Sequence, residues 1–257
     1  MIRVAAVADI HVGTDSRGAL GCHWEHLPER ADVFVLAGDL TKRGLPEEVD
    51  VLVEELDGIP QQVPTFAVLG NHDFESDEQD EVVARLEGAG VRVLEGTAEV
   101  IDVDGLAVGI AGAKGFGGGF PGACGTEFGE PAMKAFMRHS AETASRLEKA
   151  LRSVEHADVR IAVMHYAPVD ATLQGERLEI YPFLGSYFLA EAIDNAGADL
   201  ALHGHAHGGS ERGVTPGGVT VRNVAQPVLR QAYAVYCLDR AGEVGCGASP
   251  RMEVAAS

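Results

Sequence analysis

The chain has 257 residues, a length that suits one large domain or two small ones. Hydrophobic residues make up 46% and charged residues 23%, the balance of a folded globular protein, which excludes intrinsic disorder, collagen and a coiled coil. The 39 acidic and 20 basic residues give a formal net charge of −19. Because a nucleic-acid-binding surface needs clustered lysine and arginine to replace phosphate counterions, we do not expect a nucleic-acid partner.

No apolar run reaches the roughly 18 residues of a membrane span. After Met1 and Ile2, a short apolar stretch runs directly into Asp9 and His11, which is not the pattern of a signal peptide. We therefore expect a cytoplasmic protein without a membrane partner. The four cysteines contain no CxxC pair, so neither structural zinc nor a disulfide framework is expected.

The N-terminal part alternates short apolar runs with amphipathic helices. Residues 3–8, 33–37 and 65–69 are rich in valine and nearly all apolar, which predicts strands covered on both faces. A helix is predicted from Pro46 to about residue 56, and another begins with Ser76 and Gln79 at capping-box spacing. This alternation predicts a parallel sheet.

The second half continues the alternation after a β-hairpin around Asp104-Gly105. The glycine-rich segment that follows, up to Gly125, predicts no regular element, and a long helix is expected from about Pro131. Beyond it we expect strands at 160–164, 199–202, 219–224 and 232–238, and a helix near 184–195. We expect one domain over residues 1–240 and a frayed tail at 241–257.

Polar residues follow the predicted strands at the points where they end. In chain order these segments are Asp9-Ile10-His11, Gly38-Asp39, Gly70-Asn71-His72-Asp73, His165 and Gly204-His205-Ala206-His207. Since the carboxyl ends of parallel strands share one edge of an open sheet, these side chains should converge on one crevice. Gly38, Gly70 and Gly204 each precede a candidate ligand, where a missing Cβ permits a sharp turn and close backbone approach.

The converging side chains offer two carboxylates, one amide oxygen and several imidazoles. Imidazole with carboxylate suits zinc, manganese or iron, whereas calcium prefers oxygen ligands alone. The ligands are too many for one tetrahedral ion and sufficient for two, with one carboxylate bridging them. Two ions ~3.5–4 Å apart stabilise the attacking and leaving oxygens of a phosphoryl displacement. The sequence therefore predicts a site for two transition-metal ions: manganese, iron or zinc.

Together, the five segments resemble the motifs of the calcineurin-like metallophosphoesterase superfamily, which are DxH, GD, GNH[DE], a lone H and GHxH in this order. The chain reads DIH at 9–11, GDL at 38–40, GNHD at 70–73, MHYAP at 164–168 and GHAH at 204–207. Each motif is weak alone, but all five occur in order over roughly residues 2 to 240. The resemblance implies an α/β fold, a four-layer α-β-β-α sandwich with two mixed sheets.

The resemblance also implies a role for each motif residue. One metal ion would be held by Asp9, His11, Asp39 and His207. The second would be held by Asp39, Asn71, His165 and His205, so that Asp39 bridges the two. A hydroxide between the ions would attack phosphorus. His72 matches the catalytic histidine of the family, which protonates the leaving oxygen or stabilises the transition state.

One departure narrows the function within the superfamily. The phosphoprotein phosphatase branch carries GDxxDRG, whose second aspartate orients the catalytic histidine, but Lys42 stands at that position here. The GDLT sequence is more similar to the bacterial cyclic-nucleotide phosphodiesterase and general phosphoesterase branch. This implies a metal-dependent hydrolase of small phosphate esters, and we expect phosphodiesters to be preferred.

Three alternatives stay open: a phosphomonoesterase, a nuclease, and a non-catalytic protein-binding scaffold of the same fold. The net charge of −19 argues against a nuclease, and the complete ligand set argues against a scaffold. His23 and His26 either line the pocket or lie on the surface, and Arg43 either contacts phosphate or faces solvent. The segment 115–125 forms either a rim of the site or a surface excursion. The physiological ester and the oligomeric state stay undetermined.

Overall fold

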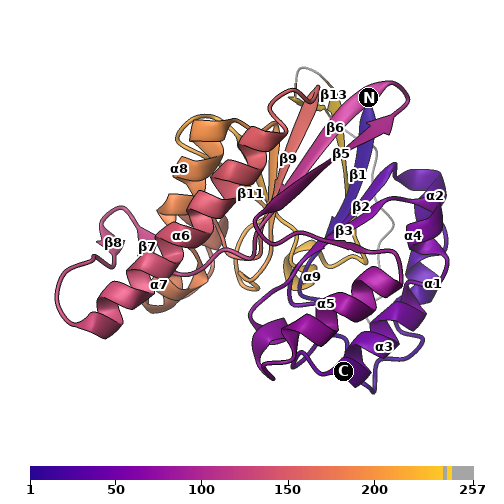
Figure 1. The fold of residues 1–257 in the computed structure, drawn as a ribbon, viewed down its shortest axis with the longest axis horizontal. Helices are drawn as coiled ribbons and strands as arrows, with labels where there is room; N and C mark the ends of the chain where they lie inside the picture. The colour runs from indigo at the N-terminus through magenta and orange to yellow at the C-terminus, as the bar shows by residue number, and fades with distance from the viewer. Residues whose placement is uncertain (240–241, 245–257) are drawn as a thin grey trace.

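The computed structural model describes residues 1–239 and 242–244. Its strands form two six-stranded sheets that stack face to face, with helices on both outer sides (Figure 1). The first sheet contains, in spatial order, β14 (Gly242–Val244), β13 (Ala234–Asp239), β1 (Ile2–Val7), β2 (Val33–Ala37), β3 (Thr65–Val68) and β4 (Arg92–Val93). The second contains β11 (Arg212–Val214), β12 (Thr220–Asn223), β10 (Leu200–His203), β9 (Val159–Val163), β6 (Leu106–Gly112) and β5 (Thr97–Val103).

Both sheets are mixed. In the first sheet β1, β2, β3 and β4 are parallel, whereas β13 pairs with β1 in the antiparallel direction. In the second sheet β6, β9, β10 and β12 are parallel, and the edge strands β5 and β11 are antiparallel to their neighbours. All the parallel strands of a sheet end at one edge, which places the polar segments that follow them together.

Five helices cover the outer face of the first sheet: α1 (Gly21–Trp24), α2 (Leu27–Arg30), α3 (Pro46–Glu55), α4 (Ile59–Gln62) and α5 (Gln79–Gly88) (Figure 1). In α3, Val49 and Leu52 pack in one buried cluster with Phe34 and Leu36 of β2. At the start of this helix, the Glu48 carboxylate accepts hydrogen bonds from the amides of Arg43 (2.8 Å) and Leu45 (3.5 Å). The amphipathic pattern therefore forms because one helix face meets the sheet.

The long helix α6 (Pro131–Ser153) and the shorter α8 (Tyr187–Ala196) cover the outer face of the second sheet (Figure 1). Between the sheets, Val4 and Val35 of the first pack with Ile110, Ile161 and Leu202 of the second. Because each central strand is buried on both faces, it lacks the polar alternation of a half-exposed strand. The expected four-layer α-β-β-α sandwich of the α/β class is confirmed.

The glycine-rich segment differs from the expectation. It contains two short paired strands, β7 (Gly119–Phe120) and β8 (Ala123–Cys124). Gly119 has φ of 93°, and a Cβ there would collide with the carbonyl oxygen of Ala123, so glycine is needed for the pairing. Phe120 is buried beside Leu184, so the segment packs against the fold instead of forming a loose surface excursion.

The predicted capping box at Ser76 is also wrong. Helix α5 begins after Glu78, and the Ser76 hydroxyl donates a hydrogen bond to the Arg43 carbonyl oxygen at 2.8 Å. The remaining elements are α7 (Tyr181–Leu184), α9 (Gln226–Leu229) and three 3₁₀ turns, η1 (His72–Phe74), η2 (Asp170–Leu173) and η3 (Leu178–Ile180).

Cysteine usage differs from the expectation at one position. Cys22 and Cys124 are free thiols, whereas Cys237 is disulfide-bonded. Across the described residues, no helix combines the length and the apolar character that crossing a membrane requires. The frayed tail expected at residues 241–257 lies outside the described residues, except that β14 pairs with β13.

Candidate metal centre

The polar segments of both sheets meet at the carboxyl ends of the parallel strands. Backbone hydrogen bonds connect the segments of the first sheet: the Asp9 amide donates to the Gly38 carbonyl oxygen (2.9 Å) and the His11 amide to that of Asp39 (3.1 Å). The second sheet joins them through His205, whose amide donates to Asp9 Oδ2 at 2.9 Å. Residues separated by 196 positions therefore lie in hydrogen-bond contact.

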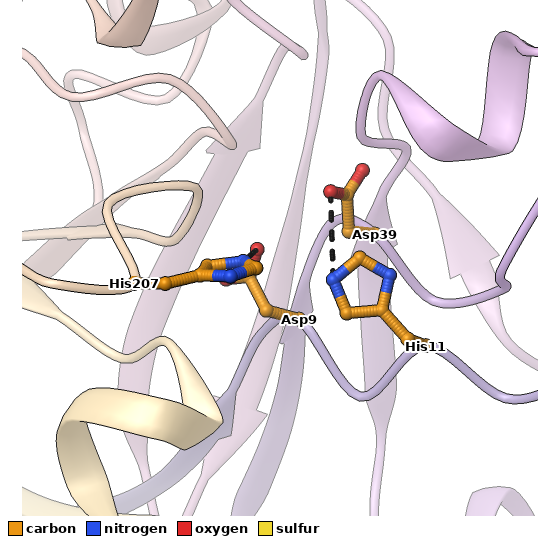
Figure 2. Close-up of side chains that lie close together, drawn as sticks. All are labelled: Asp9, His11, Asp39 and His207. Atoms are coloured by element: carbon orange, nitrogen blue, oxygen red, sulfur yellow. Dashed lines mark hydrogen bonds and ion pairs between the residues drawn. The ribbon is translucent and has the colours of Figure 1, made fainter.

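Two carboxylates and two imidazoles form the first ligand group, which consists of Asp9, His11, Asp39 and His207 (Figure 2). Each offers one atom, and these atoms all lie within 4.8 Å of one another. His207 Nε2 is 2.8 Å from Asp9 Oδ1, and this hydrogen bond raises the pKa of His207. His11 Nε2 lies 3.9 Å from Asp39 Oδ2, and burial lowers the pKa of this histidine, which favours the neutral, metal-binding form.

The second ligand group contains Asp39, His165 and His205, and Asn71 lies beside it. His165 is fully buried; its Nε2 is 3.3 Å from Asp39 Oδ1 and 3.1 Å from Asn71 Oδ1. Burial by itself would lower the pKa of His165, but the charge of Asp39 and the hydrogen bond to it raise that pKa to about 9. A cation among these atoms would take the place of the Nε2 proton.

His165 is oriented by a backbone acceptor. Its Nδ1 lies 3.0 Å from the carbonyl oxygen of Ala37, the last residue of β2. Because a carbonyl oxygen only accepts, Nδ1 carries the hydrogen, and Nε2 is the atom directed at Asp39 and Asn71. This is the arrangement that fixes the tautomer of a metal-binding histidine.

Asp39 belongs to both ligand groups, and its two oxygens face different partners. Oδ1 faces His165 and accepts the His72 amide at 2.9 Å, whereas Oδ2 faces His11. Burial tends to raise the pKa of Asp39, but the charge and hydrogen bond of His165 outweigh it and hold the pKa well below its usual range. The donors therefore fit a pair of transition-metal ions that share one carboxylate.

Unusual backbone conformations are concentrated in the ligand residues. Among the described residues, seven that are not glycine have positive φ, and four of them are Asp9 (58°), His11 (43°), Asp39 (49°) and His205 (69°). The left-handed region is unfavourable for residues with a Cβ, and it persists where the surrounding contacts require it. The backbone strain at this edge of the sheets therefore lies at the candidate ligands, where it helps to set the direction of their side chains.

The three glycines that precede the ligands leave no room for a side chain. A Cβ on Gly38 would lie 2.5 Å from His165 Nδ1. On Gly70 it would collide with Asp39, and on Gly204 with the carboxylate of Asp9. The close backbone approach that the sequence predicts at these positions is present at all three.

Asp73 has a structural role that the sequence motif does not reveal. Its carboxylate is fully buried and accepts hydrogen bonds from the amides of Leu40 (3.2 Å), Thr41 (2.9 Å) and Gly70 (2.7 Å), and from the Thr41 hydroxyl (2.7 Å). The loop after β2 carries Asp39, and the loop after β3 carries Asn71 and His72. Asp73 holds these two loops together.

His72 lies at the rim of the centre, and its side chain is 40% exposed. Its Nδ1 is 2.8 Å from the backbone carbonyl oxygen of Lys42, which only accepts, so Nδ1 carries the hydrogen. The other nitrogen, Nε2, lies 3.9 Å from Asp39 Oδ2. The phosphoprotein phosphatases have an orienting aspartate at the position of Lys42. Here the main chain of Lys42 orients the histidine instead.

Two buried polar side chains, His203 and Asn223, support the loop that carries His205 and His207. The fully buried His203 hydrogen bonds to the Gly204 carbonyl oxygen (2.8 Å) and to Thr172 Oγ1 (2.9 Å). The Asn223 amide donates to the Ala206 carbonyl oxygen at 2.8 Å, which supports the same loop. No short motif marks the contacts to Thr172 and Ala206, because the partners are 31 and 17 positions apart in sequence.

The structure brings neither His23 nor His26 into a ligand group. His23 lies in α1, and His26 is exposed with its Nε2 3.5 Å from Glu25. The Arg43 side chain is exposed. Its backbone amide donates a hydrogen bond to Glu48 of α3, and its carbonyl oxygen accepts one from the Ser76 hydroxyl.

The calcineurin-like phosphoesterase family model matches residues 2–209. The chain belongs to this family. Its members are metal-dependent hydrolases of phosphate esters, and the two ligand groups of this phosphoesterase supply the residues that such metals need. Comparison with curated protein sequences finds no match.

Solved structures show the same fold. The protein TT1561 of Thermus thermophilus is 20% identical, with a TM-score of 0.62 over 93% of this chain and 95% of that one. Phosphopantetheinyl hydrolase from Mycobacterium tuberculosis is 17% identical, with a TM-score of 0.59 over 86% and 88%. The 5'-nucleotidase precursor from Thermus thermophilus is 16% identical, with a TM-score of 0.55; 95% of this phosphoesterase aligns with 53% of that chain.

Removal of the shared carboxylate should empty the centre. In Asp39→Ala, two cations would lie close together without the anion between them, so we expect less than one equivalent of metal per chain. Elemental analysis of the purified variant measures this, with Asp57→Ala, which removes the same charge from an exposed position, as the control. Two equivalents bound with wild-type affinity would show that Asp39 does not bridge.

Gly70→Ala should displace Asp39 without changing any ligand. The added methyl group collides with Asp39, and a displacement of about 1 Å can lower turnover on the order of 10²-fold. Gly88→Ala is the matched control, because a Cβ there meets nothing within 4 Å. Hydrolysis of a p-nitrophenyl phosphate ester and metal content are measured for both. Wild-type values for both variants would contradict the need for close approach at Gly70.

Proposed function

We propose that this phosphoesterase hydrolyses small phosphodiesters at a dinuclear metal centre. The observation that carries the proposal is the position of Asp39 between two ligand groups. In this assignment the first ion is held by Asp9, His11, Asp39 and His207, and the second by Asp39, Asn71, His165 and His205. Two such ions supply Lewis acidity for in-line displacement at phosphorus; they are manganese, iron or zinc according to the donor types.

In this proposal His72 is the catalytic residue that acts on the leaving oxygen. The hydrogen bond from Nδ1 to the Lys42 carbonyl oxygen holds the ring and leaves Nε2 free on the side of Asp39. A protonated Nε2 at this place can donate its hydrogen to a leaving alkoxide. The partial exposure of the ring allows the proton to be replaced from solvent.

The preference for diesters rests on charge. Of the basic pair beside the metal motif, Lys42 is already paired with Asp15, at 2.6 Å between Nζ and Oδ1. A monoester dianion is repelled more strongly than a diester monoanion by a chain of net charge −19, since Coulomb energy scales with the product of the charges. The same repulsion acts on every phosphate of a nucleic-acid strand.

We further propose that residues 1–240 form one domain. In support, β13 near the end of the chain pairs with β1 at its beginning, so both ends of the chain complete the same sheet. The cytoplasmic location stays a prediction from the N-terminal sequence.

His72→Ala should separate catalysis from metal binding. We expect wild-type metal content and a loss on the order of 10²–10⁴-fold in turnover of an alkyl phosphodiester, whose poor leaving group needs protonation. A p-nitrophenyl diester should lose less. Steady-state kinetics on both esters test this, with the exposed His156→Ala as the control. Equal losses on the two esters would exclude a general-acid role.

Substrate class is tested with bis-p-nitrophenyl phosphate, p-nitrophenyl phosphate and a labelled single-stranded oligonucleotide, at low salt with manganese. We expect a higher kcat/KM for the diester than for the monoester and slow cleavage of the oligonucleotide, because of the charge repulsion described above. A tenfold preference for the monoester, or efficient cleavage of the oligonucleotide, would contradict the proposed substrate class.

A further inference from the structure

Lys114 lies at the edge of the candidate metal centre, two residues after the end of β6. In the second sheet β6 neighbours β9, and β9 leads to His165. The Lys114 carbonyl oxygen accepts hydrogen bonds from the amides of His165 (2.9 Å) and Tyr166 (3.2 Å). Lys114 therefore follows the strand next to the one that leads to a candidate ligand. Adjacent strands are about 4.8 Å apart.

The ammonium group of Lys114 is surrounded by aromatic rings. Its Nζ lies 4.4 Å from the ring centre of Phe74, 5.5 Å from that of Phe116 and 5.9 Å from that of Tyr166. Phe74 directly follows Asp73 of the GNHD motif, so the amine lies next to the loop that carries Asn71 and His72. Rings stabilise a cation through their negatively charged faces but offer it no hydrogen-bond acceptor of the usual kind.

Glu95, whose charge acts on Lys114, already has other partners. Glu95 Oε1 is 2.9 Å from Arg146, and its Oε2 accepts the backbone amide of Lys114 at 3.0 Å. Within residues 1–239, no carboxylate oxygen forms an ion pair with Lys114 Nζ, although the charges of Glu95 and Asp39 act on it from further away. A half-buried ammonium group without an acceptor is costly, and this cost is recovered when an anion binds to it.

We propose that Lys114 binds a second anionic group of the substrate, one that does not react. This inference rests on the proposed function and narrows the substrates to small phosphodiesters that carry one further phosphate group. The charge of Lys114 offsets, at this one place, the repulsion that the net charge of the chain exerts on added phosphates. The ligand groups and His72 face the reacting phosphate, whereas Lys114 lies one strand beyond His165 along the edge of the second sheet. Asp39 acts on Lys114 electrostatically but forms no ion pair with it, so the amine is set apart from the ligand atoms and is placed to contact a second phosphate group.

The proposal also explains why a strongly acidic protein keeps an unpaired lysine at this place. Lys42, whose carbonyl oxygen holds His72, is paired with Asp15. At Lys114 the aromatic rings exclude water without supplying a counter-charge, which strengthens the attraction to an incoming anion. Lys114 is therefore a specificity-determining residue and not a metal ligand.

The test compares two diesters that differ only by one phosphate: thymidine 5'-(p-nitrophenyl phosphate) and its 3'-phosphorylated form. Release of p-nitrophenol by the manganese-loaded protein gives kcat and KM for each. We expect the wild type to show a KM about tenfold lower for the 3'-phosphorylated diester, the effect of one charge-assisted hydrogen bond. In Lys114→Met this preference should disappear, and in Lys114→Arg it should persist.

An equilibrium measurement accompanies the kinetics. Calorimetric titration should show that the wild type binds thymidine 3',5'-bisphosphate about tenfold more tightly than thymidine 5'-phosphate, and that Lys114→Met binds the two alike. Lys149→Met is the matched control, because it removes the same charge from an exposed position on α6. The control should keep the wild-type preference, which separates a local contact from an effect of net charge.

Two results would overturn the proposal. One is a wild-type protein that binds and cleaves both members of each pair equally, which needs no variant and so does not depend on how Lys114→Met folds. The other is an equal loss for both ligands in Lys114→Met, which would place the amine at the reacting phosphate or make it purely structural. If the metal-loaded wild type cleaves neither diester, the proposed function fails, whereas the calorimetric ratio still decides the role of Lys114.

Discussion

The geometry of the candidate metal centre depends on one buried carboxylate, that of Asp73. Its four hydrogen bonds reach the loops after β2 and β3 and hold Asp39 against Asn71 and His72. Burial and the charge of Asp39 raise the pKa of Asp73, and the hydrogen bonds from Gly70 and Thr41 oppose this. Hydrogen bonds to a carboxylate are strong where the local dielectric is low, so a single residue outside the ligand set determines how the ligand loops meet.

The two sheets contribute to the centre through contacts that cross between them. Asp9 at the end of β1 accepts the His205 amide, and the Ala8 amide donates to the Val224 carbonyl oxygen at 2.9 Å. Asp9 and His205 adopt backbone conformations that residues with a Cβ avoid, and the tightly packed sheets compensate for the strain. The glycines before the ligands have the complementary role, because they let one loop approach the next.

Main-chain carbonyl oxygens orient two histidines of the candidate centre. The Ala37 carbonyl oxygen orients His165, and the Lys42 carbonyl oxygen orients His72. A carbonyl oxygen is present whatever the side chain, so His72 keeps a fixed orientation although position 42 lacks an aspartate. Side-chain identity matters instead at Lys114, where the charge itself is the function that we infer.

The sequence by itself determined the main buried strands and helices and the segments that carry the candidate ligands. Buried strands need apolar runs, and ligands follow strand ends, so both features are local and visible, as at Asp9 and His205. The tertiary structure decided the contacts between distant residues. These are the pairing of β13 with β1, the four hydrogen bonds that Asp73 accepts, and the aromatic rings around Lys114. A lone lysine after a strand has no periodicity and no motif. Its environment exists only once two sheets and the GNHD loop have packed around it, because burial and charge pairing are properties of the folded chain.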